Sequence, residues 1–110
     1  MLVAVTGGTG HVGANLLRAL LAEGHRVRTL VHQSTRAIEG LGVQQVPGDV
    51  LDPGSLRELC DGVEVVFHLA ALISIVGGRS GRVERVNVEG TRNVTEAALA
   101  ARVPRLVHAS

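Results

Sequence analysis

The stretch VTGGTGHVGANLLRALLAEG, residues 5–24, decides the fold of this chain. A short apolar run precedes it at residues 2–5 and is typical of a buried strand. Leucines then recur at helical spacing until Gly24, a residue type that commonly ends helices. The stretch therefore predicts a strand, a tight turn and an amphipathic helix. The turn between them contains Gly7, Gly8, Gly10 and Gly13.

This glycine turn is suited to a pyrophosphate group. Gly7 or Gly8 lets the chain turn sharply out of the strand, and Gly10 lets the backbone approach the phosphates. Gly13 lets the helix pack closely on the strand, and the helix N-terminus offers free N–H groups and a partial positive charge. Because the turn follows a strand and opens a helix, it predicts a bound dinucleotide. The alternative is a glycine-rich turn without a ligand.

Further strands and helices alternate along the rest of the chain. Asp52 as N-cap and Pro53 at the first helical position start a short helix that ends at Gly62. A long helix is expected at residues 83–102, with an inward stripe that includes Asn87 and Gly90. Gly90 weakens this helix, so we expect it to pack closely against the sheet. Strands are expected at residues 27–31, 43–46, 63–70 and 105–108.

This alternation predicts the α/β class. We expect one domain over residues 1–110, built as a Rossmann-type, doubly wound parallel sheet of about five strands that is truncated after the fifth. The fifth strand would then leave apolar surface and an unpaired edge exposed.

Composition excludes several classes of function. The chain has 110 residues and a net charge of +1, which argues against nucleic acid and a membrane surface as partners. No apolar run approaches the roughly twenty residues that span a bilayer. The single Cys60, expected to be buried, excludes an internal disulfide and fits a cytoplasmic protein. The five histidines show no ligand spacing, so no metal site is expected, and His68 is expected to be a satisfied core residue.

The residues after the second strand bear on the choice of cofactor. NAD sites usually place an acid there for the ribose 2′-OH, but the sequence reads VHQSTR at residues 31–36. His32 and Arg36 could meet a 2′-phosphate instead, so NADP is favoured and NAD stays open. A solvated polar loop is the alternative interpretation.

Four motifs together resemble the extended short-chain dehydrogenase/reductase family, the NAD(P)-dependent epimerase/dehydratase group. They are TGGTGHVG at residues 6–13, GDVLDPGSL at 48–56, VFHLAA at 66–71 and VNVEGTRNV at 86–94. The segment VRTLVH and the ALIS loop are most similar to the dihydroflavonol-reductase-like branch, which usually has arginine at the position of His32.

The resemblance implies a set of cofactor contacts. The pyrophosphate would lie against the glycine turn, the adenine beside the loop after the third strand, and the nicotinamide ribose along the fourth strand's end. Structure explains a buried Asn87 as well as ligand binding does. The implied residues are Gly7, Gly10, His11 and Val12 for the pyrophosphate, Asp49 and Val50 for the adenine, Leu69, Ala70 and Ala71 for the ribose, and Asn87.

The family's catalytic pair is absent. Relatives use a tyrosine as proton donor and a lysine four residues later that lowers its pKa. This sequence contains no tyrosine, and all eleven basic residues are arginine, so we assign no catalytic residue, Ser110 included. We therefore expect the NAD(P)-binding portion of an oxidoreductase acting on a small-molecule carbonyl or hydroxyl group. The alternatives are an epimerase or dehydratase fragment and a non-catalytic sensor module; a homo-oligomer stays open.

Overall fold

The structure is a computed structural model, and it describes residues 1–7, 11–32, 38–69 and 80–109. Every predicted strand and helix is present, with ends shifted by a few residues. In chain order the elements are β1 (Leu2–Thr6), α1 (His11–Ala22), β2 (Arg26–Val31), β3 (Gln44–Pro47), α2 (Pro53–Cys60), β4 (Val65–Leu69), α3 (Ser80–Ala100) and β5 (Arg105–Ala109).

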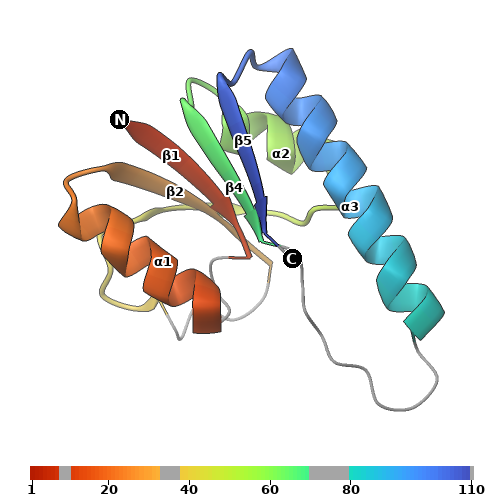
Figure 1. The fold of residues 1–110 in the computed structure, drawn as a ribbon, viewed down its shortest axis with the longest axis horizontal. Helices are drawn as coiled ribbons and strands as arrows, with labels where there is room; N and C mark the ends of the chain where they lie inside the picture. Colours follow the sequence, from red (N-terminus) through yellow and green to blue (C-terminus); the bar gives the residue numbers. More distant parts are fainter. Residues whose placement is uncertain (8–10, 33–37, 70–79, 110) are drawn as a thin grey trace.

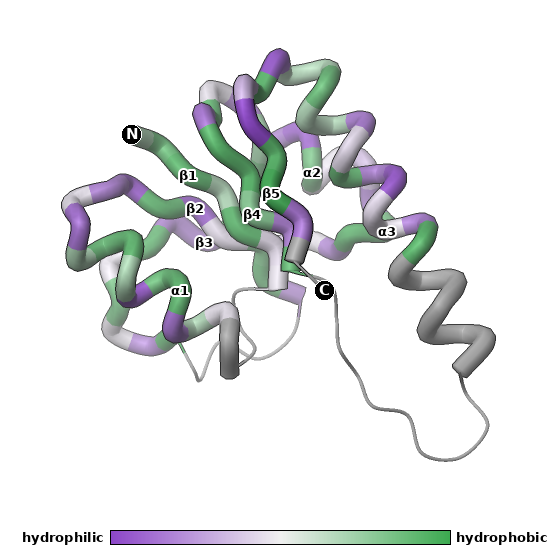
Figure 2. Tube along the Cα trace, viewed as in Figure 1, coloured by the Kyte–Doolittle hydropathy of each residue, from purple (hydrophilic) through white to green (hydrophobic). Residues whose placement is uncertain are grey.

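The strands form one parallel sheet in the order β3-β2-β1-β4-β5. β1 is the central strand, and Val3, Ala4 and Val5 are each at most 1% exposed. A strand that is covered on both faces needs an apolar sequence, and β1 is hydrophobic along most of its length (Figure 2). The predicted Rossmann-type parallel sheet is confirmed.

Helices cover the two faces of the sheet unequally. α1 packs Ala14, Leu17 and Leu20 on one face, whereas α2 and α3 lie on the other (Figure 1). β5 is an edge strand, and its Leu106 is 37% exposed. The predicted exposure of apolar surface at the fifth strand is therefore confirmed.

Two helices end in the same way with different residues. After α1, Gly24 has φ +87°, and the N–H of His25 donates to the carbonyl of Leu20. After α3, Arg102 has φ +58°, and the N–H of Val103 donates to the carbonyl of Ala98. Both ends have the left-handed residue and the hydrogen bonds of a Schellman motif. The left-handed Arg102 ends α3 two residues before the predicted end.

The short helix α2 has a side-chain partner at each end. The carboxylate of Asp52 accepts the N–H of Gly54, which confirms its predicted role as N-cap. At the other end, Nη1 of Arg28 donates to the carbonyls of Glu58, Leu59 and Asp61 at 3.1, 3.0 and 2.8 Å. An arginine on β2 therefore neutralises the free carbonyls of α2. Cys60 in the last turn is buried, as predicted, and burial raises the pKa of its thiol although Arg28 opposes the shift.

Candidate functional site

Four of the predicted cofactor residues lie at the carboxyl edge of the sheet. Gly7 follows β1, His32 follows β2, Asp49 lies two residues beyond β3, and Leu69 ends β4. In open parallel sheets, ligands bind outside this edge. The topology therefore brings together residues that lie up to 62 positions apart in the sequence.

Gly7 approaches the backbone at the end of β4 closely. Its φ is +75°, and a Cβ added there would lie 2.8 Å from the carbonyl oxygen of Leu69. Only glycine fits this position without strain, because the left-handed backbone and the short distance both exclude a side chain. The predicted sharp turn at Gly7 is confirmed, and the turn begins in direct contact with the end of β4.

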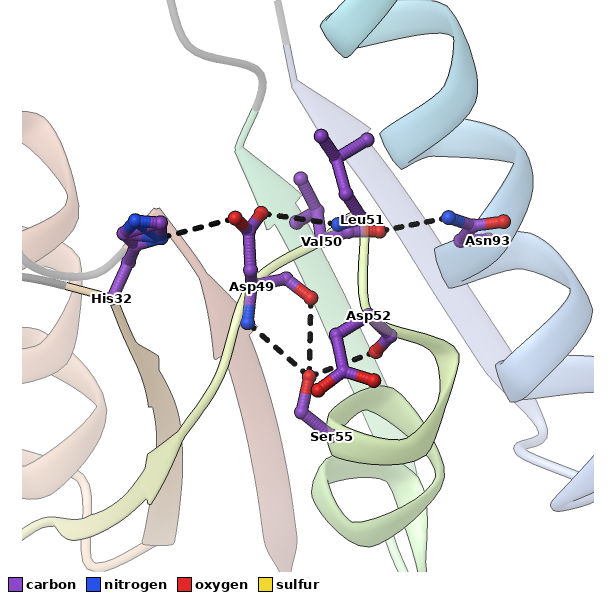
Figure 3. Close-up of polar contacts among 7 residues, drawn as sticks. All are labelled: His32, Asp49, Val50, Leu51, Asp52, Ser55 and Asn93. Carbon is purple, nitrogen blue, oxygen red and sulfur yellow. Dashed lines mark hydrogen bonds and ion pairs between the residues drawn. The ribbon is translucent and has the colours of Figure 1, made fainter.

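His32 and Asp49, just beyond the ends of β2 and β3, form a polar pair. Nδ1 of His32 lies 3.1 Å from Oδ2 of Asp49, with side chains that are 54% and 36% exposed (Figure 3). The other carboxylate oxygen of Asp49 accepts the N–H of Leu51 at 3.0 Å. Each oxygen of Asp49 thus has one partner, and the imidazole is held at the end of β2.

The loop of residues 48–52 is held by Ser55, which lies in the first turn of α2. Its hydroxyl accepts the N–H of Asp49 at 3.2 Å and lies 3.1 and 2.8 Å from the carbonyl oxygens of Asp49 and Asp52. Gly48 must be glycine, because a Cβ there would lie 2.1 Å from the Cβ of Ser55. No sequence pattern marks Ser55 beyond its place in the first turn of α2.

Helix α3 holds the same loop from its other side. Nδ2 of Asn93 donates to the carbonyl of Val50 at 3.0 Å (Figure 3). A Cβ added at Gly90 would lie 2.7 Å from Cγ2 of Val50. The close packing expected of Gly90 therefore exists, but the expected partner was wrong: it is the loop after β3 and not the sheet.

His68 is buried behind the site and has two hydroxyl partners. Its Nδ1 lies 2.6 Å from Oγ1 of Thr6, and its Nε2 lies 3.0 Å from Oγ1 of Thr91. Burial, with a smaller contribution from His108, lowers the pKa of His68 to about 4. The imidazole is therefore neutral near pH 7, which confirms the prediction of a satisfied core histidine.

Other predicted residues are only partly described. For His11 and Val12 in α1, and for Asn87 in α3, the structure describes the backbone alone. Gly10, Arg36, Ala70 and Ala71 lie outside the described residues. Within the described ranges, no group of three His, Cys, Asp or Glu side chains could hold a metal ion. In that same part of the chain, no helix is both long and apolar enough to cross a membrane.

The chain is similar to proteins of a known family. The model of the 3-beta hydroxysteroid dehydrogenase/isomerase family matches residues 4–110. Sterol demethylase protein B of Methylococcus capsulatus is 45% identical over 112 residues, which cover 100% of this chain and 34% of that protein. A dihydroflavonol 4-reductase-like protein of Synechocystis sp. is 43% identical over 108 residues, covering 96% of this chain and 31% of that one.

Solved structures share the fold. A short-chain dehydrogenase/reductase superfamily protein from Agrobacterium tumefaciens, solved with bound NAD, is 37% identical with a TM-score of 0.84. The match covers 100% of this chain and 32% of that one. The chain therefore spans about a third of the length of the relatives it matches. The resemblance to short-chain dehydrogenases/reductases, including dihydroflavonol-reductase-like proteins, is confirmed.

Proposed function

Because the chain belongs to the 3-beta hydroxysteroid dehydrogenase/isomerase family, we propose that it forms the NADP-binding part of an oxidoreductase. The whole protein would transfer hydride between NADP(H) and a carbonyl or hydroxyl group of a small molecule. Binding of NAD by the related Agrobacterium structure supports a nicotinamide dinucleotide as the cofactor. The nicotinamide ring would supply the hydride chemistry, and this chain would bind and orient it.

The observation that carries this proposal is the turn at Gly7. Gly7 follows the central strand, four residues before α1 begins at His11, and it lies against the carbonyl of Leu69 with no room for a Cβ. Such a turn lets a pyrophosphate approach the backbone and the first N–H groups of the following helix. The residues present therefore fit a dinucleotide at this edge.

We assign each part of the cofactor to a part of this edge. The glycine turn and the start of α1 would hold the pyrophosphate, the loop after β3 the adenine, and the end of β4 the nicotinamide ribose. The assigned residues are Gly7, Gly10, His11 and Val12 for the pyrophosphate, Asp49 and Val50 for the adenine, Leu69, Ala70 and Ala71 for the ribose, and Asn87 from α3.

NADP is favoured over NAD by the residues at the end of β2. An acidic residue there would select the free 2′-OH, but this chain has His32. Asp49 holds the His32 ring at the edge, where the imidazole, together with Arg36, would meet a 2′-phosphate. The cytoplasmic location expected from the sequence stays a prediction.

Proton transfer to the substrate needs residues that these 110 positions do not include. Reduction of a carbonyl requires a proton donor beside the oxygen, and the chain has neither the tyrosine nor the lysine of a Tyr-x-x-x-Lys pair. The described residues would contribute by binding and orienting the cofactor. In the native gene product, a Tyr-x-x-x-Lys pair outside these residues would support the oxidoreductase.

Titration of the 110-residue chain with NADPH, followed by nicotinamide fluorescence, tests the proposal. We expect saturable binding in the micromolar range that 2′,5′-ADP reverses, with NADH binding more weakly. The absence of binding at high micromolar NADPH and NADH would refute dinucleotide binding. Equal affinity for the two cofactors would refute only the preference for NADP.

A further inference from the structure

The loop between β3 and α2 is held by contacts with three elements, β2, α2 and α3. Ser55 holds the backbone of Asp49, and the carboxylate of Asp49 holds the N–H of Leu51. Gly48 anchors the start of the loop by donating its N–H to the carbonyl of Val31 at 2.9 Å. A loop with this many internal bonds offers its remaining polar groups in a fixed direction.

Helix α3 supplies the third support from a distant part of the sequence. Asn93 donates to the carbonyl of Val50 across 43 residues, and one helical turn earlier Gly90 lets the Val50 side chain approach the helix backbone. The two contacts act on opposite ends of Val50, one on its carbonyl and one on its side chain. Together they fix the distance of Val50 from α3 and the orientation of its peptide group.

The backbone N–H of Val50 differs from its neighbours in the loop. The N–H groups of Gly48, Asp49, Leu51 and Asp52 all donate to acceptors. No acceptor for the N–H of Val50 lies among the described residues. A donor next to a carboxylate matches the edge of adenine, which presents an acceptor at N1 beside the donor of its 6-amino group.

We infer that Asn93 and Gly90 are positioning residues for adenine recognition, because they hold the Val50 N–H and the Asp49 carboxylate in the register that the adenine edge requires. This inference rests on the proposed function, since it presumes that a dinucleotide binds at this edge. Neither residue need touch the cofactor. Both act through Val50, so loss of either loosens the same donor–acceptor pair.

Deamino-NADPH, which carries hypoxanthine in place of adenine, tests the inference. Hypoxanthine has a donor at N1 and an acceptor at O6, so a site built for adenine should reject it. We expect the unchanged chain to bind NADPH about tenfold more tightly than deamino-NADPH. In Asn93→Leu this ratio should fall to about two or three, because the leucine has a similar size but no amide donor. The ratio compares two ligands on one protein, so general destabilisation does not lower it.

A second variant guards against a failure of Asn93→Leu to fold. Gly90→Ala improves the intrinsic helix preference of α3 but forces Val50 to move. It should therefore lower the same ratio while the chain stays folded. Arg92→Leu is the matched control, since Arg92 is exposed on the same helix turn and should leave the ratio unchanged.

The outcomes separate the inference from the proposed function. A lower ratio in both variants supports positioning by α3. An unchanged ratio in the variants overturns the inference but leaves dinucleotide binding intact, as does an unchanged chain that binds both ligands equally. A chain that binds neither NADPH nor NADH overturns the proposed function and the inference with it.

Discussion

The imidazole rings of His68 on β4 and His108 on β5 are stacked, with centroids 5.1 Å apart and planes inclined by 22°. The stack joins the last two strands beneath the candidate site. Because His68 is only 5% exposed and its two nitrogens already face threonine hydroxyls, a proton on it would lack solvation and would face the neighbouring ring. The ring stack between these strands therefore depends on a neutral His68.

Acid should weaken the fold through His68. Its pKa is about 4 in the folded chain and 6.5 in the unfolded one, so between these values only the unfolded chain takes up the proton. The stabilisation is complete above pH 6.5, declines as the pH falls towards 4 and then levels off, with a loss on the order of 3 kcal/mol. Urea unfolding of the unchanged chain and His68→Gln at pH 7.5, 5.5 and 4 measures this. A pH dependence that is the same in both proteins would contradict the prediction.

Arg28 should stabilise the fold by capping α2. Arg28→Met removes the donor to three carbonyls and should lower the free energy of unfolding by about 1 to 2 kcal/mol. Arg28→Lys should fall in between, because an ammonium lacks the planar fork of the guanidinium. Arg26→Met on the same strand is the control, since Arg26 is exposed. Equal losses at the two positions in urea unfolding would show that the capping contributes nothing.

Gly7 and Gly24 form a natural comparison. Both have positive φ, but a Cβ at Gly24 would meet nothing within 4 Å, whereas one at Gly7 would meet Leu69. Gly24→Ala should therefore cost only the left-handed strain, about 1 to 2 kcal/mol. Gly7→Ala should cost roughly a further 1 to 3 kcal/mol from the clash and should weaken NADPH binding. Similar losses of thermal stability would mean that the backbone relaxes around Gly7.

Arg102→Gly should stabilise the chain. Arg102 adopts φ +58°, which costs a non-glycine residue about 1 to 2 kcal/mol. Glycine would remove this strain, but its greater conformational entropy in the unfolded chain offsets part of the stabilisation. We expect a net gain of about 0.5 kcal/mol, visible as a higher melting temperature. Arg92→Gly, in the interior of α3, should lose about 1 kcal/mol. A loss at both positions would contradict the left-handed cap.

Substitutions of two side chains, Arg36 and His32, test the proposed preference for NADP. Arg36→Ala should weaken binding of NADPH roughly tenfold and leave NADH nearly unchanged, because only NADPH carries the 2′-phosphate. His32→Gln should act in the same direction with a smaller effect. Arg105→Ala, on the exposed start of β5, serves as the control in fluorescence titrations. If Arg36→Ala weakened the binding of NADPH and NADH equally, Arg36 would not contact the 2′-phosphate.

The fold was predictable because its signals are local. The turn at Gly7, the leucines of α1 and the Asp52-Pro53 start of α2 each depend on neighbours within a few residues, and all three are found where the sequence places them. Positive-φ glycines mark turns by the same local rule. The left-handed Arg102 has no such signal, and the predicted end of α3 was accordingly two residues late.

The supports of the candidate site were not predictable in this way. Asn93 and Arg28 act on backbone carbonyls that lie 43 and about 30 residues away, and no periodicity specifies which carbonyl an amide or guanidinium will reach. The inward stripe of α3 placed Gly90 correctly but could not name Val50 as its neighbour. Sequence patterns assign residues to a face of an element, whereas the partner on that face is fixed only by the packing of whole elements.

The central position of β1 also has a consequence in time. β1 pairs with β2 through Leu2 and Arg26, but its other edge pairs with β4 through Val3 and Val65, which is synthesised 62 residues later. At about 5 to 20 residues per second, translation leaves roughly 3 to 12 seconds between the synthesis of β1 and that of β4. During that interval, a strand that is buried on both faces in the finished sheet has one open edge. The nascent chain is most exposed to mispairing and to chaperones in this window, before β4 leaves the ribosome.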